Sequence, residues 1–285
     1  MKRMGIWCLV LCLLLGLCAC GKEEQKPAKK PLEPYVEEEE DLSADTVWVT
    51  LREGLTIPEM AQVLEQNKVC SAADFINAVQ TVDYDYAFLK NLPDDANRIY
   101  RLEGYLFPDT YEFYIDSRAS TVVNRMLANF QKRTQDLLPQ IEAQGWTLDE
   151  AVIFASMIQG EADTKENMKK VSRVLHNRLA PNSGFTKLQL CSTRDYANFL
   201  LANGDHDADA LEQAYNTYYR EGLPIGAINN PGLDALTAAL TPSEDAAIKQ
   251  CYYFATDYKT GITYFSKTYK EHQAMIEKYG ITDIG

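Results

Sequence analysis

The sequence is poor in the residues that build metal, redox or nucleic-acid sites. Its 3 histidines are scattered and its 7 cysteines form no CxxC pair, so neither a zinc site nor a thiol redox motif is indicated. Basic residues are also scarce: 28 Lys and Arg against 41 Asp and Glu give a formal net charge of −13, which argues against a nucleic-acid partner. We therefore expect no metal, no other cofactor and no bound nucleic acid.

The N-terminus holds an apolar run that is too short for a comfortable membrane span. A positively charged start is followed by apolar residues 6–17 and then by Leu17-Cys18-Ala19-Cys20-Gly21. This ending is typical of a bacterial lipobox, with cleavage before Cys20 and lipid on its thiol. A cysteine-rich ordinary signal peptide is the alternative. The lipobox predicts a lipoprotein signal peptide over 1–19 and a lipid anchor on the outer side of the cell membrane.

Residues 20–45 follow the lipobox with Lys, Glu and Pro dominating, and they predict a disordered acidic linker. Residues 46–81 then read as a small unit. A strand-like alternation over 47–51 precedes the capping-box pair Thr56 and Glu59, and a second short helix is expected after it. A strand followed by two short helices resembles a LysM-like glycan-binding module.

Residues 82–285 predict a mixed array of helices with one hairpin. Helices are expected over 119–139, from Thr147 to the region of Glu161, over 166–179, over 211–219 and over 269–279, with hairpin strands at 251–256 and 262–266. Helices and strands do not alternate regularly. The expected fold class is therefore α+β, with the LysM-like module preceding a larger helix and hairpin domain.

One glutamate stands at the end of a nearly all-apolar helix. Thr147 and Glu150 form a capping box, residues 151–158 leave almost no polar face, and Gly160 is a plausible loosening point before Glu161. A carboxyl held against apolar surroundings has a raised pKa and can donate and retrieve a proton near neutral pH. A glycan-cleaving acid needs this property. The alternative is a solvated surface glutamate past a helix end.

The segment Arg101–Phe113 is dense in aromatic rings, Gly, Pro and acids. Such a stretch either buries its rings in a structural turn or lines a sugar cleft. Its residues Leu102-Glu103-Gly104-Tyr105-Leu106-Phe107-Pro108-Asp109-Thr110-Tyr111 closely resemble the signature of the YceG-like endolytic murein transglycosylases.

Four further stretches match that family in the same order. They are Ala155-Ser156-Met157-Ile158-Gln159-Gly160-Glu161; Val171 to Leu179, ending Asn177-Arg178-Leu179; Tyr215-Asn216-Thr217-Tyr218 with the Gly-Pro-rich run to Gly232; and Phe265-Ser266-Lys267-Thr268 with Glu271-His272. The resemblance spans about 46–278 and implies a YceG-like catalytic domain over 82–285. Two positions depart from the family pattern: Gln159 replaces an acid, and Cys191 replaces another in the run Leu188–Thr193.

The resemblance implies an enzyme, a lytic transglycosylase acting on peptidoglycan glycan strands in cell-wall assembly, with Glu161 as its catalytic residue. It implies substrate contacts from Glu103, Tyr105, Asp109, Asn177, Arg178, Gln189, Tyr215, Asn216, Thr217 and Tyr218. Glu103 is a candidate supporting carboxylate, whereas Asn216 and Tyr218 could also serve as turn and core residues. Expected protein partners are penicillin-binding synthases and the elongation machinery. Gln159 and Cys191 keep a second hypothesis open, a non-catalytic peptidoglycan-binding lipoprotein that regulates synthesis.

Overall fold

A computed structural model describes residues 31–37, 45–204, 206–257 and 259–281. The chain divides into Met1–Pro31 and Leu32–Gly285, and the account below concerns the second unit. The predicted signal peptide and Cys20 lie outside the described residues. In the described part of the chain, no helix is both long and apolar enough to cross a membrane.

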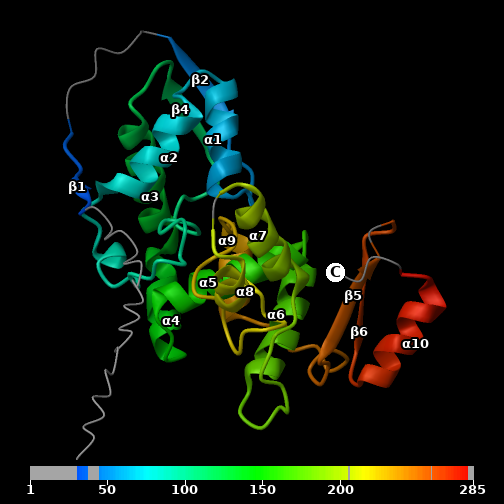
Figure 1. Cartoon of the computed structure of the whole chain (residues 1–285). Helices are drawn as coiled ribbons and strands as arrows, with labels where there is room; N and C mark the ends of the chain where they lie inside the picture. Colours follow the sequence, from blue (N-terminus) through cyan, green and yellow to red (C-terminus); the bar gives the residue numbers. More distant parts are fainter. Residues whose placement is uncertain (1–30, 38–44, 205, 258, 282–285) are drawn as a thin grey trace, which may run out of the picture. The chain divides into compact units, whose positions relative to one another are not determined.

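The N-terminal part of this unit joins two helices to a two-stranded sheet (Figure 1). β2 (Thr46–Thr50) leads into α1 (Ile57–Gln66) and α2 (Ala72–Thr81), and both predicted helix starts are confirmed by side-chain caps. β2 pairs antiparallel with β4 (Thr110–Tyr114), and α2 packs on α3 (Ala119–Thr134). Because strand pairing and helix packing both cross residue 81, the prediction of a separate LysM-like module over 46–81 is not confirmed.

Part of the predicted disordered linker is ordered. β1 (Glu33–Pro34) pairs in parallel with β3 (Val82–Asp83), and a short 3₁₀ helix, η1 (Ala87–Leu89), follows. The ring of Tyr35 stacks on Tyr84 with centroids 5.5 Å apart. Aromatic contact and backbone pairing together outweigh the polar, Pro-rich composition of this short stretch.

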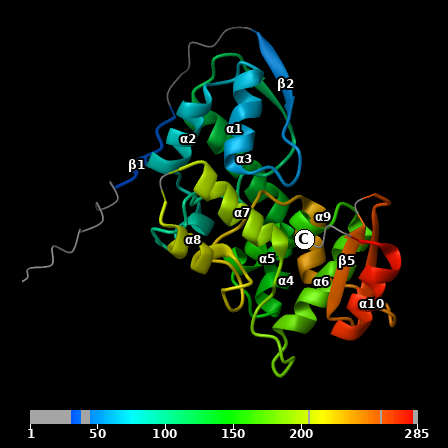
Figure 2. The ribbon, with the colours of Figure 1, turned by 45° about the vertical axis from the view of Figure 1, so that its right-hand side comes forward.

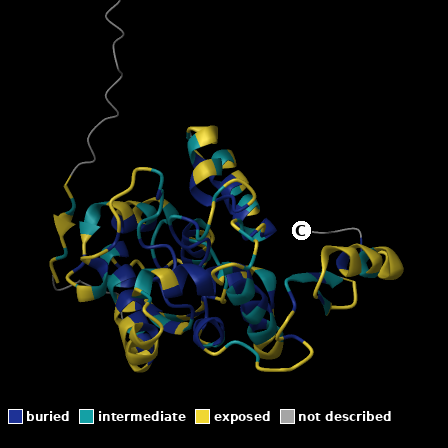
Figure 3. Ribbon diagram, turned by 90° about the horizontal axis from the view of Figure 1, so that it is seen from below, coloured by how far each residue is buried: buried dark blue, intermediate teal, exposed yellow. Residues whose placement is uncertain are grey.

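The centre of the unit is α5 (Leu148–Glu161), whose residues 151–158 are all buried. It contacts α4 (Leu138–Ala143), α6 (Lys165–Leu179), α7 (Cys191–Ala202) and α9 (Leu233–Leu240) (Figure 2). Figure 3 shows the buried residues, in dark blue, gathered at the centre of the unit, with exposed residues on the outer faces of the helices. The predicted starts of α5 and α6 are confirmed, whereas α7 and α9 were not predicted.

Two predicted helices have different bounds. The helix expected over 119–139 ends at Thr134, followed by η2 (Gln135–Leu137) and then α4, because Pro139 is tolerated only in the first turn of a helix. The helix expected over 211–219 is α8 (Ala208–Tyr215), which stops where Asn216 becomes extended.

The C-terminal region is a hairpin followed by a helix, as predicted. β5 (Tyr253–Asp257) pairs antiparallel with β6 (Ile262–Ser266), and α10 (Tyr269–Tyr279) packs against both. A capping box fixes the start of α10, and left-handed Gly280 ends it. The mixed α+β class is therefore confirmed.

Candidate active site

Glu161 is the last residue of α5, as the sequence predicts. Thr147 Oγ1 accepts the Glu150 N–H at 3.1 Å, and Glu150 Oε2 accepts the Thr147 N–H at 2.7 Å. This capping box fixes the start of the helix, and burial of residues 151–158 fixes its path through the core. Ala162 is extended, so the helix delivers Glu161 to the edge of the core and stops there.

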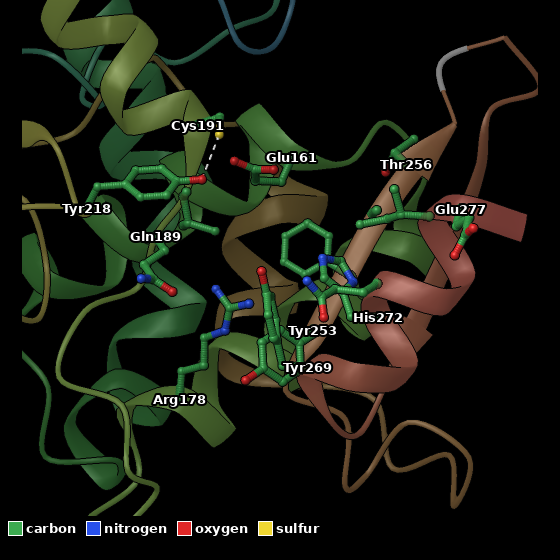
Figure 4. Close-up of a pocket in the computed structure, with 15 residues that line it drawn as sticks. Glu161, Arg178, Gln189, Cys191, Tyr218, Tyr253, Thr256, Tyr269, His272 and Glu277 are labelled. Carbon is green, nitrogen blue, oxygen red and sulfur yellow. Dashed lines mark hydrogen bonds between the residues drawn. The ribbon is translucent and has the colours of Figure 1, made fainter. Parts of the chain in front are cut away.

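Glu161 faces a cavity of about 680 Å³. One wall comes from the ends and flanks of α5, α6, α7 and α8, and the other from β5 and α10 (Figure 4). The lining consists of Glu161, Arg178, Gln189, Leu190, Cys191, Tyr218, Tyr253, Phe254, Ala255, Thr256, Tyr269, His272, Gln273, Ile276 and Glu277. A cavity with both aromatic and hydrogen-bonding walls suits a large polar ligand such as a sugar chain.

The surroundings of Glu161 favour its protonated form. Burial raises the pKa of Glu161 above the ordinary glutamate value, and hydrogen bonding from Ser192 together with the positive charge of Arg178 only partly opposes this. The Ser192 backbone N–H donates to Glu161 Oε1 at 3.3 Å. A half-buried carboxyl with a raised pKa that borders a cavity can act as a proton donor.

Gly160 permits the close approach of α7 to the end of α5. Helix α5 continues through Gly160 rather than loosening there, and a Cβ at this position would lie 2.9 Å from Ser192 Cβ. The approach places the first turn of α7 beside Glu161. One buried atom at this contact, Asn229 Oδ1, has no hydrogen-bond partner among the described residues.

Arg178 lies in the cavity on α6 and is held by backbone carbonyls. Its Nε donates to Tyr252 O at 2.7 Å, and Nη1 donates to Leu188 O. The guanidinium lies over the Tyr253 ring, 5.6 Å from its centroid, and points into the cavity in Figure 4. The site therefore has a fixed positive group beside its acid.

Gln189 and Tyr218, two other predicted contacts, also line the cavity. The Gln189 backbone has φ 54° and its N–H donates to Thr217 O at 3.1 Å, which fixes the left-handed turn that presents the side chain. The hydroxyl of Tyr218 lies 3.1 Å from Cys191 Sγ. Glu161, Arg178, Gln189 and Tyr218 are thus brought together from four separate sequence stretches.

Three other predicted residues, Tyr215 at the end of α8 and the two that follow it, are buried next to Tyr218 in the sequence. Tyr215 and Thr217 are buried and do not line the cavity, and neither does Asn216, whose Oδ1 accepts the Tyr218 N–H at 3.0 Å. Thr217 Oγ1 accepts the Leu190 N–H at 2.9 Å. Asn216 and Thr217 therefore fix the loops that carry Tyr218 and Gln189.

Glu103 is sealed in the core, away from the cavity lining. It is 0% exposed and accepts the Ile57 N–H at 3.1 Å, the Asn230 amide at 2.6 Å and the Tyr196 hydroxyl at 3.2 Å. Burial raises the pKa of Glu103 to about 8, opposed by these donors. The residue joins α1, α7 and the segment before α9, and in this structure it has no access to a ligand.

Three more predicted residues lie outside the cavity lining. Tyr105 is fully buried and donates to Asp149 Oδ1 at 2.6 Å. Asp109 accepts from Asn129 and Arg133, and Asn177 donates to the carbonyl of Cys251 at 2.8 Å. These side chains join elements together. The dense aromatic segment is therefore mainly a buried turn, the first of its two predicted readings.

The wall formed by β5 and α10 was missed as a site. Tyr253, Tyr269, His272 and Glu277 line the cavity, although the sequence predicted only a hairpin and a helix there. His272 is buried with Nδ1 unpartnered among the described residues, and burial lowers its pKa, so the ring is neutral near pH 7. The sequence did offer one indication, because His272 belongs to the family motif that begins at Phe265.

The first departure from the family pattern, Gln159, does not line the cavity, and its Oε1 accepts the Gly232 N–H at 3.1 Å. The second, Cys191, lies in the lining, and burial raises the pKa of its thiol.

Among the described residues there is no group of three His, Cys, Asp or Glu side chains placed to hold a metal ion.

Comparisons with known proteins agree with this architecture. Residues 29–278 match the sequence profile of the YceG-like family. The chain is 26% identical over 247 residues to an endolytic murein transglycosylase of Streptococcus pneumoniae strain D39, covering 81% of this chain and 44% of that protein. It is 27% identical over 245 residues to one of Bacillus subtilis, covering 81% and 64% respectively.

A crystal structure of a YceG-like protein from Listeria monocytogenes superposes with a TM-score of 0.65 at 28% identity, covering 80% of this chain and 75% of that one. The chain spans about half the length of the pneumococcal relative and about two thirds of the Bacillus one. The profile match extends over most of the sequence, so the chain belongs to the YceG-like family.

Proposed function

We propose that this protein is an endolytic peptidoglycan lytic transglycosylase with Glu161 as its catalytic residue. It cleaves the bond between N-acetylmuramic acid and N-acetylglucosamine inside glycan strands and leaves 1,6-anhydro ends. The observation that carries the proposal is a carboxyl with a raised pKa at the edge of a 680 Å³ cavity. The names of the pneumococcal and Bacillus relatives, endolytic murein transglycosylase, point to the same activity.

The reaction needs one carboxyl that acts twice. Protonated Glu161 gives its proton to the glycosidic oxygen as the bond from that oxygen to C1 of the muramic residue breaks. The ionised Glu161 then takes the proton of the C6 hydroxyl of the same residue, whose oxygen bonds to C1 and closes the anhydro ring. The proton returns to Glu161, no water is consumed, and the other fragment leaves with a free hydroxyl.

The remaining predicted residues divide into two groups in this proposal. Arg178, Gln189 and Tyr218 line the cavity and contact the strand. The others do not line the cavity and instead join the surrounding elements to one another; they are Glu103, Tyr105, Asp109, Asn177, Tyr215, Asn216 and Thr217. Such supporting residues keep a site within the narrow tolerance that catalysis requires.

The two departures from the family pattern do not favour a non-catalytic role. The side chain of Gln159 accepts a hydrogen bond from the Gly232 backbone and does not line the cavity. Replacing the family's acid by Gln at this position therefore takes no carboxylate out of the cavity. Cys191 replaces an acid in the lining but leaves Glu161 in place. The regulatory, non-catalytic hypothesis therefore has less support than the enzyme.

We further propose that the protein works on the outer side of the cell membrane, anchored through lipid on Cys20. Penicillin-binding synthases and the elongation machinery remain the proposed protein partners. Metabolic labelling with a fatty acid tests the anchor: wild-type chain should incorporate the label, and Cys20→Ala should not. Equal labelling of both would remove the anchor from the proposal.

The activity is tested by digesting murein sacculi and nascent glycan strands with the purified protein, with Glu161→Gln alongside. Mass spectrometry should find 1,6-anhydro ends with wild type alone. Reducing ends would instead indicate hydrolysis, with Glu277 as the other carboxyl in the lining available to activate water. Binding without cleavage by wild type would support the regulatory hypothesis.

A further inference from the structure

The wall of the cavity opposite Glu161 carries an aromatic surface. Tyr253 on β5 and Tyr269 at the start of α10 have ring centroids 5.8 Å apart, and His272 stacks on Tyr253 at 5.4 Å. Tyr269 is 58% exposed, so more than half of this residue remains accessible to a ligand. Figure 4 shows these rings across the cavity from Glu161 and Tyr218.

Polar groups flank this aromatic surface on both sides. Gln273 and Glu277, exposed on α10, line the same cavity, and Arg178 lies over the Tyr253 ring. A pyranose ring has an apolar face of C–H groups and an edge of hydroxyls. An open tyrosine ring bordered by amide, carboxylate and guanidinium groups matches both parts.

The position of Tyr269 is fixed before any ligand arrives. Thr268 Oγ1 accepts the Glu271 N–H at 3.2 Å, and Glu271 Oε2 accepts the Thr268 N–H at 3.0 Å, so a capping box holds the first turn of α10. The ring of Tyr269 also contacts the rings of Tyr253 and His272, with centroids 5.8 and 6.4 Å away. A rigid aromatic surface binds with little loss of conformational entropy.

We propose that Tyr269, supported by Tyr253 and His272, is a sugar-stacking subsite that holds a pyranose ring of the glycan strand adjacent to the bond at Glu161. The strand then lies between the wall of Tyr218 and the wall of α10. This inference rests on the proposed function for its substrate class. It assigns to the C-terminal hairpin and helix a role in binding the strand and not in cleaving it.

The same helix offers a matched control. Tyr279, at the other end of α10, is 44% exposed and stacks on Tyr264 at 4.2 Å, but it does not line the cavity. Tyr269→Ala removes the stacking ring, Tyr269→Phe keeps the ring and removes only the hydroxyl, and Tyr279→Ala removes a comparable ring elsewhere. A general loosening of α10 would affect both alanine variants.

The test measures calorimetric affinity for peptide-free glycan strands, using the full-length chain in detergent and a Glu161→Gln background that prevents cleavage. Tyr269→Ala should weaken binding about tenfold, the loss typical of a central aromatic anchor. Tyr269→Phe and Tyr279→Ala should remain within about twofold of the parent. In the wild-type background, Tyr269→Ala should raise KM with kcat nearly unchanged, because a ring that touches neither C1 nor the glycosidic oxygen binds equally in the ground and transition states.

Unchanged affinity in Tyr269→Ala would overturn the subsite, as would an equal loss in Tyr279→Ala, or no strand binding by the parent. The proposed function fails separately. If wild type leaves strands uncut while Tyr269→Ala still weakens binding and Tyr279→Ala does not, the subsite stands and the transglycosylase assignment falls.

Discussion

Two carboxyl groups with raised pKa values, Glu103 and Glu161, occupy very different regions of this protein. Glu103 lies sealed between α1, α7 and the segment before α9, where a backbone N–H, an amide and a phenol hydroxyl all donate to it. Glu161 is half-buried at the cavity, with the Ser192 N–H at 3.3 Å. Burial raises both pKa values, yet only Glu161 can meet a substrate. A raised pKa therefore marks a proton donor only where the carboxyl is also accessible.

The largest expected effect separates the two carboxyls by activity. Glu161→Gln keeps the size of the side chain but removes both proton steps, so glycan cleavage should fall at least about 10³-fold. Glu103→Gln should retain most activity, because Glu103 does not line the cavity and Gln matches the size of its neutral form. Release of anhydro ends per minute, measured for both variants by mass spectrometry, checks this. Comparable losses in the two variants would contradict the comparison.

The second prediction concerns the contact that positions Glu161. In Gly160→Ala the new Cβ would lie 2.9 Å from Ser192 Cβ and push α7 away. Overpacking costs about 1–3 kcal/mol, partly offset by the better helix propensity of Ala, about 1 kcal/mol. Activity should fall about tenfold through misplacement of Glu161.

The double variant Gly160→Ala/Ser192→Gly is the matched control, because it removes the Cβ that the new methyl meets. It should recover much of the lost activity and stability, a coupling that a double-mutant cycle measures. Simple additivity of the two changes would show that this contact does not position the site.

The third prediction tests the sealed carboxyl through the pH dependence of stability. The pKa of Glu103 is about 8 in the folded protein against 4.5 ordinarily, so between these values the folded state binds more protons than the unfolded state. Its contribution to the free energy of unfolding must then decrease as pH rises, by up to about 1.4 kcal/mol per pH unit.

Glu103→Gln cannot ionise and should remove this slope. Relative to wild type, its stability should improve steadily from pH 5 to pH 8, as urea unfolding at several pH values would show. The Tyr196 hydroxyl can rotate to accept from the new amide, so the hydrogen-bond network survives. A pH-independent difference between the two proteins would refute a protonated Glu103.

The smallest expected effect is at Cys191. Cys191→Asp places a second acid in the lining near Glu161, and like charge should raise the pKa of Glu161 further. The acid form would then persist to higher pH, moving the alkaline limb of the pH–rate profile upward by about half a pH unit. Cys191→Ser, which adds no charge, should leave the limb in place, and an equal shift in both variants would rule out electrostatics.

The sequence predicted the cavity wall that carries Glu161 better than the wall formed by β5 and α10. Capping-box pairs and apolar periodicity gave the starts of α1, α5 and α10 because these signals are local. Helix α7 was missed because its N-cap, Leu190, makes no side-chain cap, and α9 because it follows a Gly-Pro-rich run. The pairing of β2 with β4 joins residues about sixty positions apart, which no local pattern records.

By itself, the sequence determined the helix that carries Glu161, the α+β class and the family resemblance, because all three follow from local spacing and ordered motifs. Only the tertiary structure decided which motif residues reach the cavity. Glu103 and Tyr105 lie in the same recognisable motif, yet both are buried in the core, whereas Tyr269 carries no such signal and faces Glu161 across the cavity. Access to a ligand depends on how distant segments pack, and one-dimensional spacing does not specify it.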